Sequence, residues 1–137
     1  MTNIDLSSQT LIPSTTGFMI TGNAANDRFG WSVSTAGDIN NDGYDDIIIG
    51  AANKNSIQGA AYVIYGGPKS TMTNILLATQ TLDPQNTGFM ITGNAAADYF
   101  GISVRTAGDI NNDGYDDIIV GAYYKNSQRG AAYVIYN

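Results

Sequence analysis

The sequence predicts an all-β fold built from β-propeller blades, with two four-stranded antiparallel blades in the 137-residue chain. Residues 72–137 repeat residues 1–66 without a gap, and about three-quarters of the aligned positions are identical. Each repeat contains four short runs rich in β-branched and aromatic residues, separated by turn-forming residues. We therefore expect two units, residues 1–71 with their linker and residues 72–137, which together form one propeller segment.

The expected strands of the first unit can be justified in chain order. Residues 17–21 (Gly-Phe-Met-Ile-Thr) and 32–36 (Ser-Val-Ser-Thr-Ala) combine β-branched or aromatic residues at close spacing, with a turn-rich segment between them. Residues 46–51 contain three consecutive isoleucines, which indicate a buried strand. Residues 61–65 (Ala-Tyr-Val-Ile-Tyr) form the fourth strand after the turn-rich segment 53–56.

An oxygen-rich loop precedes the isoleucine run and recurs 71 residues later. Its first, third, fifth and ninth positions carry Asp or Asn, and a glycine at the sixth position allows a sharp turn. The seventh residue is a tyrosine, which would contribute its backbone carbonyl. The spacing predicts one Ca²⁺ site per loop, about two per chain. The expected ligands are Asp38, Asn40, Asp42, Tyr44 and Asp46, and Asp109, Asn111, Asp113, Tyr115 and Asp117.

The loops allow two other interpretations, an EF-hand and a turn that binds no metal. An EF-hand needs a bidentate glutamate at the twelfth position, but Ile49 and Val120 occupy it, and a β-branched run follows instead of a helix. Alternatively the loops are turns that bind no metal, because Asp, Asn and Gly favour turns in any case. The eighth-position residues, Asp45 and Asp116, are expected to face solvent or to support the ligands.

Composition argues against catalysis. The chain has no Glu, His or Cys, which removes the usual general bases and the strongest nucleophile. Eight of its twelve aspartates lie in the two loops. Asp27 and Asp98 could form a glycosidase-like pair of carboxylates, but no motif supports it. The chain is therefore predicted not to be an enzyme.

Charge and hydropathy limit the kinds of partner that the sequence predicts. The net charge is −6, and six scattered basic residues form no patch for nucleic acid. No apolar run approaches the ~20 residues of a membrane-spanning helix, and the N-terminus lacks the order of a signal peptide. We expect no nucleic-acid partner and no membrane insertion.

Further motifs recur around each loop. Phe29-Gly30 and Phe100-Gly101 open the inner strands, and Ala36-Gly37-Asp38 leads into the first loop. Gly50-Ala51-Ala52 ends the isoleucine run, and residues 59–63 read Gly-Ala-Ala-Tyr-Val. Together with the loops, these motifs resemble the FG-GAP repeats of the integrin alpha-subunit β-propeller, with their Phe-Gly, Gly-Ala-Pro and Gly-x-x-Tyr-Val elements; the proline of the second element is missing here.

The resemblance implies a strand order and a function. In the first blade the strands would be residues 32–38 (innermost), 46–51, 60–65 and 89–92 (outermost), with each calcium loop joining the first two. It also implies a non-catalytic, calcium-binding module, extracellular or at the cell surface, that serves as a structural or adhesion scaffold. Alternatives are a lectin-like or protein-binding propeller and, less favoured, a hydrolase-associated propeller. The binding alternative would use the aromatic residues Trp31, Tyr99, Tyr123 and Tyr124.

This strand order leaves residues 18–21 without a blade and the second blade without an outer strand. Because the two gaps are complementary, strand exchange between neighbouring chains would close a ring with no free edge. We expect a homo-oligomer, either a trimer with six blades or a tetramer with eight. The alternative is an open fragment that needs the rest of a longer protein.

Overall fold

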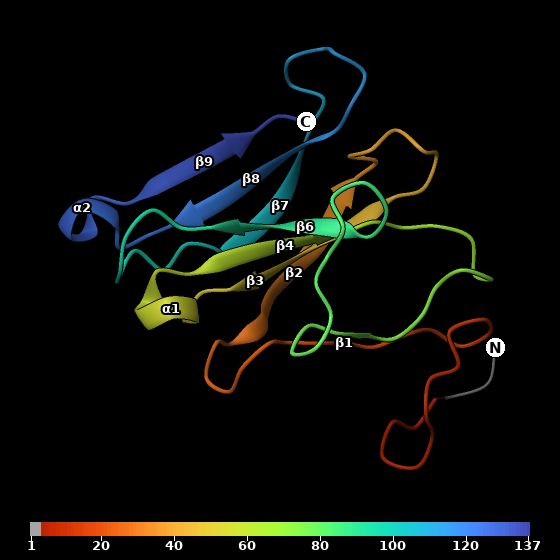
Figure 1. Ribbon diagram of the computed structural model, residues 1–137. Coiled ribbons are helices and arrows are strands. Elements are labelled where there is room, and N and C mark those ends of the chain that lie inside the picture. Colours follow the sequence, from red (N-terminus) through yellow and green to blue (C-terminus); the bar gives the residue numbers. More distant parts are fainter. Residues whose placement is uncertain (1–3) are drawn as a thin grey trace.

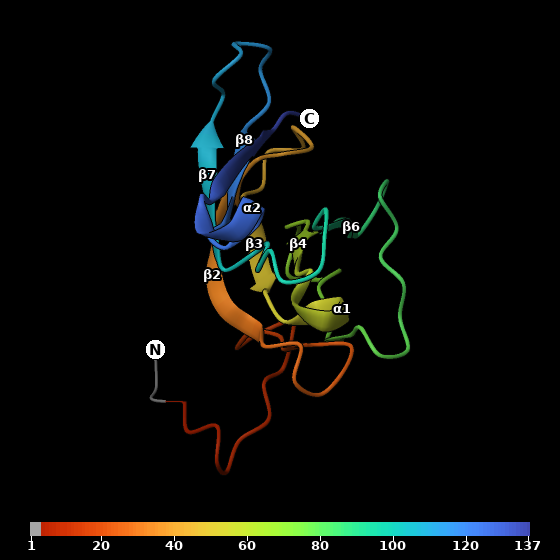
Figure 2. The ribbon, with the colours of Figure 1, turned by 90° about the vertical axis from the view of Figure 1, so that its left-hand side faces the viewer.

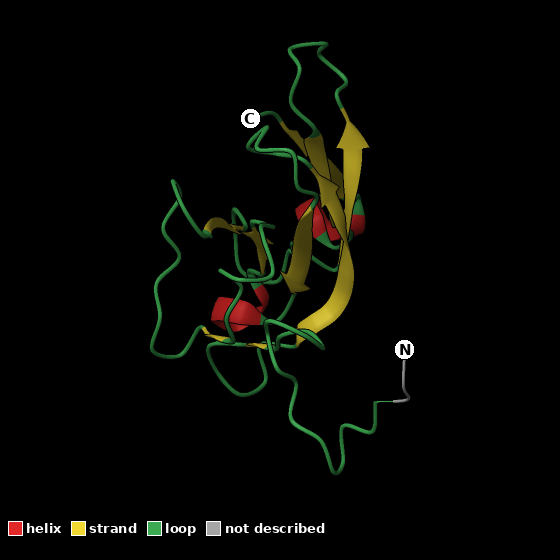
Figure 3. Ribbon diagram, turned by 90° about the vertical axis from the view of Figure 1, so that its right-hand side faces the viewer, coloured by secondary structure: helices red, strands yellow, loops and turns green. Residues whose placement is uncertain are grey.

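The computed structural model describes residues 4–137; residues 1–3, with which the first predicted unit begins, lie outside the described residues. Most strands lie in two antiparallel sheets, which pack against each other. Much of the N-terminal segment is loop (Figures 1 and 3). The elements are β1 (Ile20–Thr21), β2 (Phe29–Gly37), β3 (Asp46–Ala51), α1 (Lys54–Ile57), β4 (Ala60–Ile64), β5 (Ile75–Leu76), β6 (Gly88–Thr92), β7 (Ser103–Gly108), β8 (Asp117–Ala122), α2 (Lys125–Gln128) and β9 (Ala131–Ile135).

The four-stranded sheet, called blade 1, has the order β2-β3-β4-β6. This is the order expected from the sequence, and its outer strand β6 comes from the second repeat. In the ladder between β4 and β6, Ala60 pairs with Thr92 and Ile64 with Gly88. The innermost strand β2 is longer than expected, and its register shifts twice against β3. Blade 1 is therefore assembled from both repeats.

The three-stranded sheet, called blade 2, has the order β7-β8-β9. Its strands repeat the inner three of blade 1, and Ile118 and Ile135 pair as Ile47 and Ile64 do. No other strand among residues 4–137 pairs with the outer edge of β9. The described chain thus contains one four-stranded blade and one three-stranded blade, rather than two four-stranded blades.

The N-terminal strand has a partner that the sequence does not indicate. Residues 18–21 were expected to lie outside both blades, and they do, but Ile20–Thr21 pairs in parallel with Ile75–Leu76. The N–H of Ile75 donates to the Met19 carbonyl at 2.9 Å, and the N–H of Leu77 donates to the Thr21 carbonyl at 3.0 Å. Ile20 also packs against a buried cluster on blade 1 that includes Tyr62. The segment gains backbone hydrogen bonds and apolar contact without joining a blade.

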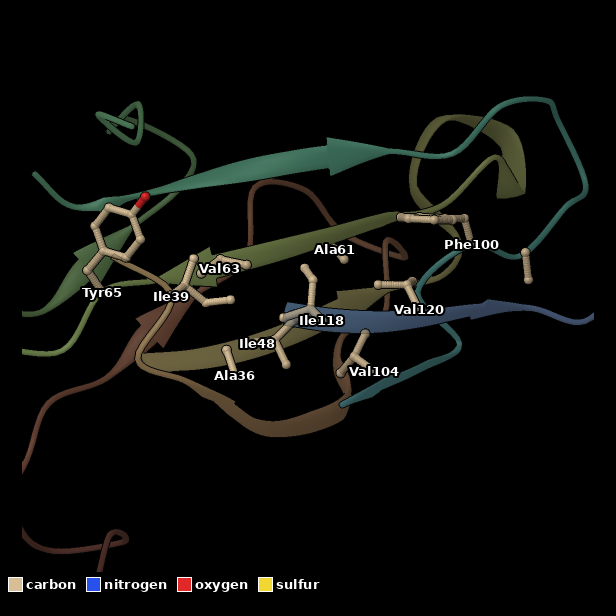
Figure 4. Packing of buried hydrophobic residues seen from close by; sticks show 11 residues of the cluster. Ala36, Ile39, Ile48, Ala61, Val63, Tyr65, Phe100, Val104, Ile118 and Val120 are labelled. Atoms are coloured by element: carbon tan, nitrogen blue, oxygen red, sulfur yellow. The ribbon is translucent and has the colours of Figure 1, made fainter. Parts of the chain in front are cut away.

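The main core lies between the two blades (Figure 4). Blade 1 contributes alternate residues such as Ile48 and Val63, whereas blade 2 contributes Val104, Ile118 and Val120. Ile48, Val63 and Val120 are fully buried. Since successive strand residues point to opposite faces, each blade has one face in this core and one face outside it.

Candidate metal centre

The two oxygen-rich loops occupy equivalent places in the blades. One joins β2 to β3 and the other joins β7 to β8, and both lie at the end of the sheets opposite α1 and α2 (Figures 1 and 2). The innermost strand brings the chain to this end, and the isoleucine-rich strand leads it away. The adjacency of the strands expected around each loop is therefore confirmed.

The first loop folds over its own carboxylates. The Asp38 carboxylate accepts the backbone N–H of Asp42 at 3.0 Å and that of Gly43 at 2.8 Å. The Asn40 side-chain oxygen also accepts from the Asp42 N–H, at 3.2 Å, and Asp42 Oδ1 accepts from the Tyr44 N–H at 3.0 Å. Gly43 has a φ of +89°, which a glycine adopts without strain. These bonds gather the oxygens of positions one, three and five around one turn.

The second loop repeats this arrangement. Asp109 accepts the N–H groups of Asp113 at 3.0 Å and Gly114 at 2.9 Å, and Asp113 accepts the N–H of Tyr115 at 3.0 Å. Asn111 accepts from the Asp113 N–H at 3.2 Å. The loop geometry therefore follows from the local sequence and does not depend on the position in the chain.

The ninth-position carboxylates are buried under the loops. Asp46 is fully buried, and its two oxygens accept the N–H groups of Ile39 at 2.9 Å and Gly66 at 2.8 Å. Burial raises the pKa of the Asp46 carboxyl, and the charges of Asp42 and Asp38 add to the rise. The two N–H groups act in the opposite direction. The charges of Asp38 and Asp42 thus act on the buried carboxylate beneath them.

The corresponding carboxylate in the second loop accepts fewer hydrogen bonds. Asp117 is fully buried, and its Oδ2 accepts from the Ile110 N–H at 3.0 Å. Its Oδ1 has no hydrogen-bond partner among residues 4–137. A buried carboxylate oxygen without a donor is costly unless a cation or another donor compensates it.

The donor set fits a hard cation such as Ca²⁺. All side-chain donors are oxygens, and a carboxylate oxygen that accepts one N–H retains capacity for a metal. Within residues 4–137 no three acidic side chains form a preformed metal cage. The carboxylates instead accept hydrogen bonds from loop N–H groups.

Asp116 makes a contact that the sequence does not indicate. It was expected to face solvent or to support the ligands of its own loop. Instead its Oδ2 accepts the backbone N–H of Asp38 in the other blade at 2.9 Å. The side-chain amide of Asn137 likewise donates to the Ile39 carbonyl at 2.8 Å. Both contacts tie blade 2 to the first loop.

The two aspartates considered as a catalytic pair are each held by a lysine of their own repeat. Asp27 pairs with Lys54 at 3.4 Å and Asp98 with Lys125 at 3.0 Å. These side chains are between 9% and 15% exposed, so the pairs are largely shielded from water. The arrangement gives both carboxylates a structural role.

The divergent aromatic residues form exposed groups. Tyr99, Tyr123 and Tyr124 lie together, with ring centroids 5.1 to 5.9 Å apart. Trp31 is 61% exposed, and the Arg28 guanidinium lies 5.0 Å from its ring. At all four positions the other repeat carries a different residue that is not aromatic.

Within the described residues, no helix has the length and hydropathy needed to cross a membrane.

Comparison with known proteins agrees with the motif pattern. The chain matches the FG-GAP repeat family at residues 29–64 and 100–135. It is 41% identical over 70% of its length to "Integrin alpha pat-2" of Caenorhabditis briggsae. It is 34% identical over 80% of its length to "Integrin alpha-IIb" of Mus musculus, and 32% identical over 87% to "Integrin alpha-PS2" of Drosophila melanogaster. It spans only 7%, 10% and 8% of the lengths of these relatives.

Proposed function

The chain belongs to the FG-GAP repeat family, and from that premise we propose that it is a non-catalytic, calcium-binding β-propeller module that serves as a structural or adhesion scaffold. The observation that carries the proposal is the pair of oxygen-rich loops, each of which gathers hard donors over a buried aspartate. The similarity to integrin alpha subunits supports a scaffold role outside the cell or at its surface.

One calcium ion per loop would relieve a local excess of negative charge. Each loop contains four aspartates, and no basic side chain forms an ion pair with any of them among residues 4–137. In each site the side chains of positions one, three, five and nine and the tyrosine carbonyl would bind the ion. The asparagine at position three lowers the ligand charge, which favours micromolar-to-millimolar affinity.

The exposed tyrosines support a second candidate function. Tyr99, Tyr123 and Tyr124 form a group whose last two members are 53% and 37% exposed. Exposed aromatic side chains provide large contact areas for a glycan or a protein ligand. In this alternative the propeller is a binding module, and a Tyr123→Ser/Tyr124→Ser variant would lose the ligand while keeping calcium.

A calcium titration tests the main proposal. We expect isothermal titration calorimetry of the wild-type protein to give about two ions per chain. The melting temperature should rise with calcium, since a ligand at about 100 times its Kd contributes about 2.7 kcal/mol per site. The variant Asp42→Ala/Asp113→Ala should lose both effects because it removes a central ligand from each loop.

The matched control removes the same charge elsewhere. Asp5 and Asp83 are exposed and lie outside the loops, so Asp5→Ala/Asp83→Ala should bind calcium as the wild type does. Equal melting of the wild type and the loop variant, with and without calcium, would contradict the proposed metal sites.

A further inference from the structure

The outer face of each blade consists of residues whose equivalents in the other blade are buried in the core between the blades. Val33 on the outer face of blade 1 is 67% exposed, whereas Val104, at the equivalent position in blade 2, is 9% exposed in the interblade core. Val134 on the outer face of blade 2 is 41% exposed, whereas its equivalent, Val63, is fully buried. The chain therefore exposes part of each half of its own interblade interface a second time; the rest of the blade 1 face, around Tyr62, is covered by Ile20, Leu77 and their neighbours.

The outer face of blade 1 is hollowed and apolar. A groove on it is lined by Phe18, Phe29, Val33, Ile47 and Ile49, among others. In blade 2, Phe100, Val104, Ile118 and Val120 occupy the positions of the last four, and they pack against blade 1. At this groove Val33 remains exposed and Phe29 and Ile47 are half-buried, whereas Ile49 is already covered within the chain.

The free edge of β9 also has a counterpart within the chain. β9 has the sequence Ala-Ala-Tyr-Val-Ile, identical to that of β4, whose outer edge is paired with β6. The sequence of β6, Gly-Phe-Met-Ile-Thr, recurs without change at residues 17–21. Only Ile20–Thr21 of that segment is held in a ladder, and Met19 is 58% exposed. Within residues 4–137, the edge of β9 that corresponds to the paired edge of β4 is thus open, and residues 17–21 have the sequence of the strand that fits it.

The polar contacts between the blades have unused equivalents as well. Ser32 Oγ donates to the Gly101 carbonyl at 2.8 Å, and the Asp38 N–H donates to Asp116 at 2.9 Å. The equivalent of Asp116 is Asp45, which is exposed, and no donor among residues 4–137 reaches its carboxylate. The equivalent of Asp38 is Asp109, which is also exposed.

We propose that copies of this chain associate head to tail. The outer face of blade 2 and the free edge of β9 bind the outer face of blade 1 and residues 17–21 of a second copy. Asp45 of one copy then accepts the Asp109 N–H of the other. The interface is heterologous, because it joins two different surfaces, and repeated use of it closes a ring when the rotation allows. The internal interface supplies the template for every contact.

Association requires residues 17–21 to leave β5. In exchange for a two-residue parallel ladder, the segment would form a five-residue antiparallel ladder like that between β4 and β6. The edge of β9 would no longer face water. Neither change involves a side chain proposed to bind calcium, and Asp109 takes part only through its backbone N–H, so the test of association can fail independently of calcium binding.

Two single variants give a decisive test of the faces. Val33→Asp places a charge on the outer face of blade 1, and Val134→Asp does the same on blade 2; both side chains are exposed, so each chain should fold. Native mass spectrometry of the wild type should show an oligomer, three or four times the 14.5 kDa chain mass in a closed ring. Each variant alone should be monomeric, because every interface then contains one charged face.

Mixing the two variants distinguishes a head-to-tail interface from any symmetric one. Each variant retains one intact face, and the two intact faces are complementary, so the mixture should form a 1:1 dimer that grows no further. Formation of this dimer also shows that both variants are folded. A wild type that stays monomeric at its highest soluble concentration would overturn the proposal and leave these faces to other segments of a longer protein. So would a single variant that still forms oligomers.

Disulfide trapping tests the strand exchange, since the chain contains no cysteine. In the ladder of blade 1, Ala61 lies opposite Ile91, so the equivalent residues Ala132 and Ile20 should be opposite each other across copies. Oxidation of a mixture of Ala132→Cys and Ile20→Cys chains should give a disulfide-linked heterodimer. An Ala61→Cys/Ile91→Cys chain is the positive control and should close its disulfide within one molecule. A positive control without heterodimer would overturn the exchange of residues 17–21.

Discussion

Replacing Gly59 with alanine is expected to lower the free energy of unfolding by about 2 to 5 kcal/mol. Gly59 has a φ of +85°, where a side chain is strained. A Cβ at this position would also collide with the backbone of Phe100, which forms a bridge with Gly59 at the start of blade 2. The substitution therefore strains the local backbone and pushes the blades apart.

The repeat supplies the control for this effect. Gly130 occupies the same position in the second repeat with a φ of +74°, but a Cβ there would lie 3.3 Å from the nearest atom, the Tyr123 carbonyl oxygen. Gly130→Ala should cost only the backbone strain, about 1 to 2 kcal/mol. Urea denaturation of both variants in a Val33→Asp background, which keeps chains apart, measures the difference. Equal losses would mean that the contact between Gly59 and Phe100 contributes nothing.

Truncating Ile48 should have a comparable effect through packing. Ile48 is fully buried in the core between the blades, so Ile48→Ala should cost about 2 to 5 kcal/mol through lost apolar contact and the cavity left behind. Ile119 has the equivalent position on the half-buried outer face of blade 2. In the same monomeric background, Ile119→Ala should cost about 1 kcal/mol.

Thermal and urea unfolding of this pair report on the interblade core. A larger loss for Ile48→Ala, with an unchanged dependence on urea concentration, is the expected result. Similar losses for both variants would show that the two blades do not share a core in solution.

The strands could be predicted because their signals are local. The third strand was expected at residues 46–51 and is observed as Asp46–Ala51, since an isoleucine run between Asp and Gly-Ala leaves little ambiguity. The place of residues 88–92 at the outer edge of blade 1 followed from the family resemblance. The extension of β2 back to Phe29 was missed, because a register shift lets the chain pair on either side of Gly30.

The contacts missed from the sequence are those that join the blades. Asp116 meets Asp38 across 78 positions, and Asn137 meets Ile39 across 98. Whether these side chains face solvent or a neighbouring loop depends on how two twisted sheets pack against each other. The spacing of apolar residues along the chain does not indicate this packing. The pairing of β1 with β5 was missed for a related reason, since a two-residue ladder has no periodic signal. The ligand spacing of the loops was the most readable feature, because each loop is contiguous.

The strand β6 completes a blade that begins in the preceding repeat, and this offset has a genetic consequence. An unequal crossover between two such similar repeats adds or removes 71 codons wherever it falls within them. Each repeat then still provides the outer strand for the repeat before it and takes its own from the repeat after it. Gene length can therefore vary in whole repeats while the surfaces that join one repeat to the next stay the same, and no new contact has to evolve before a longer or shorter array can fold.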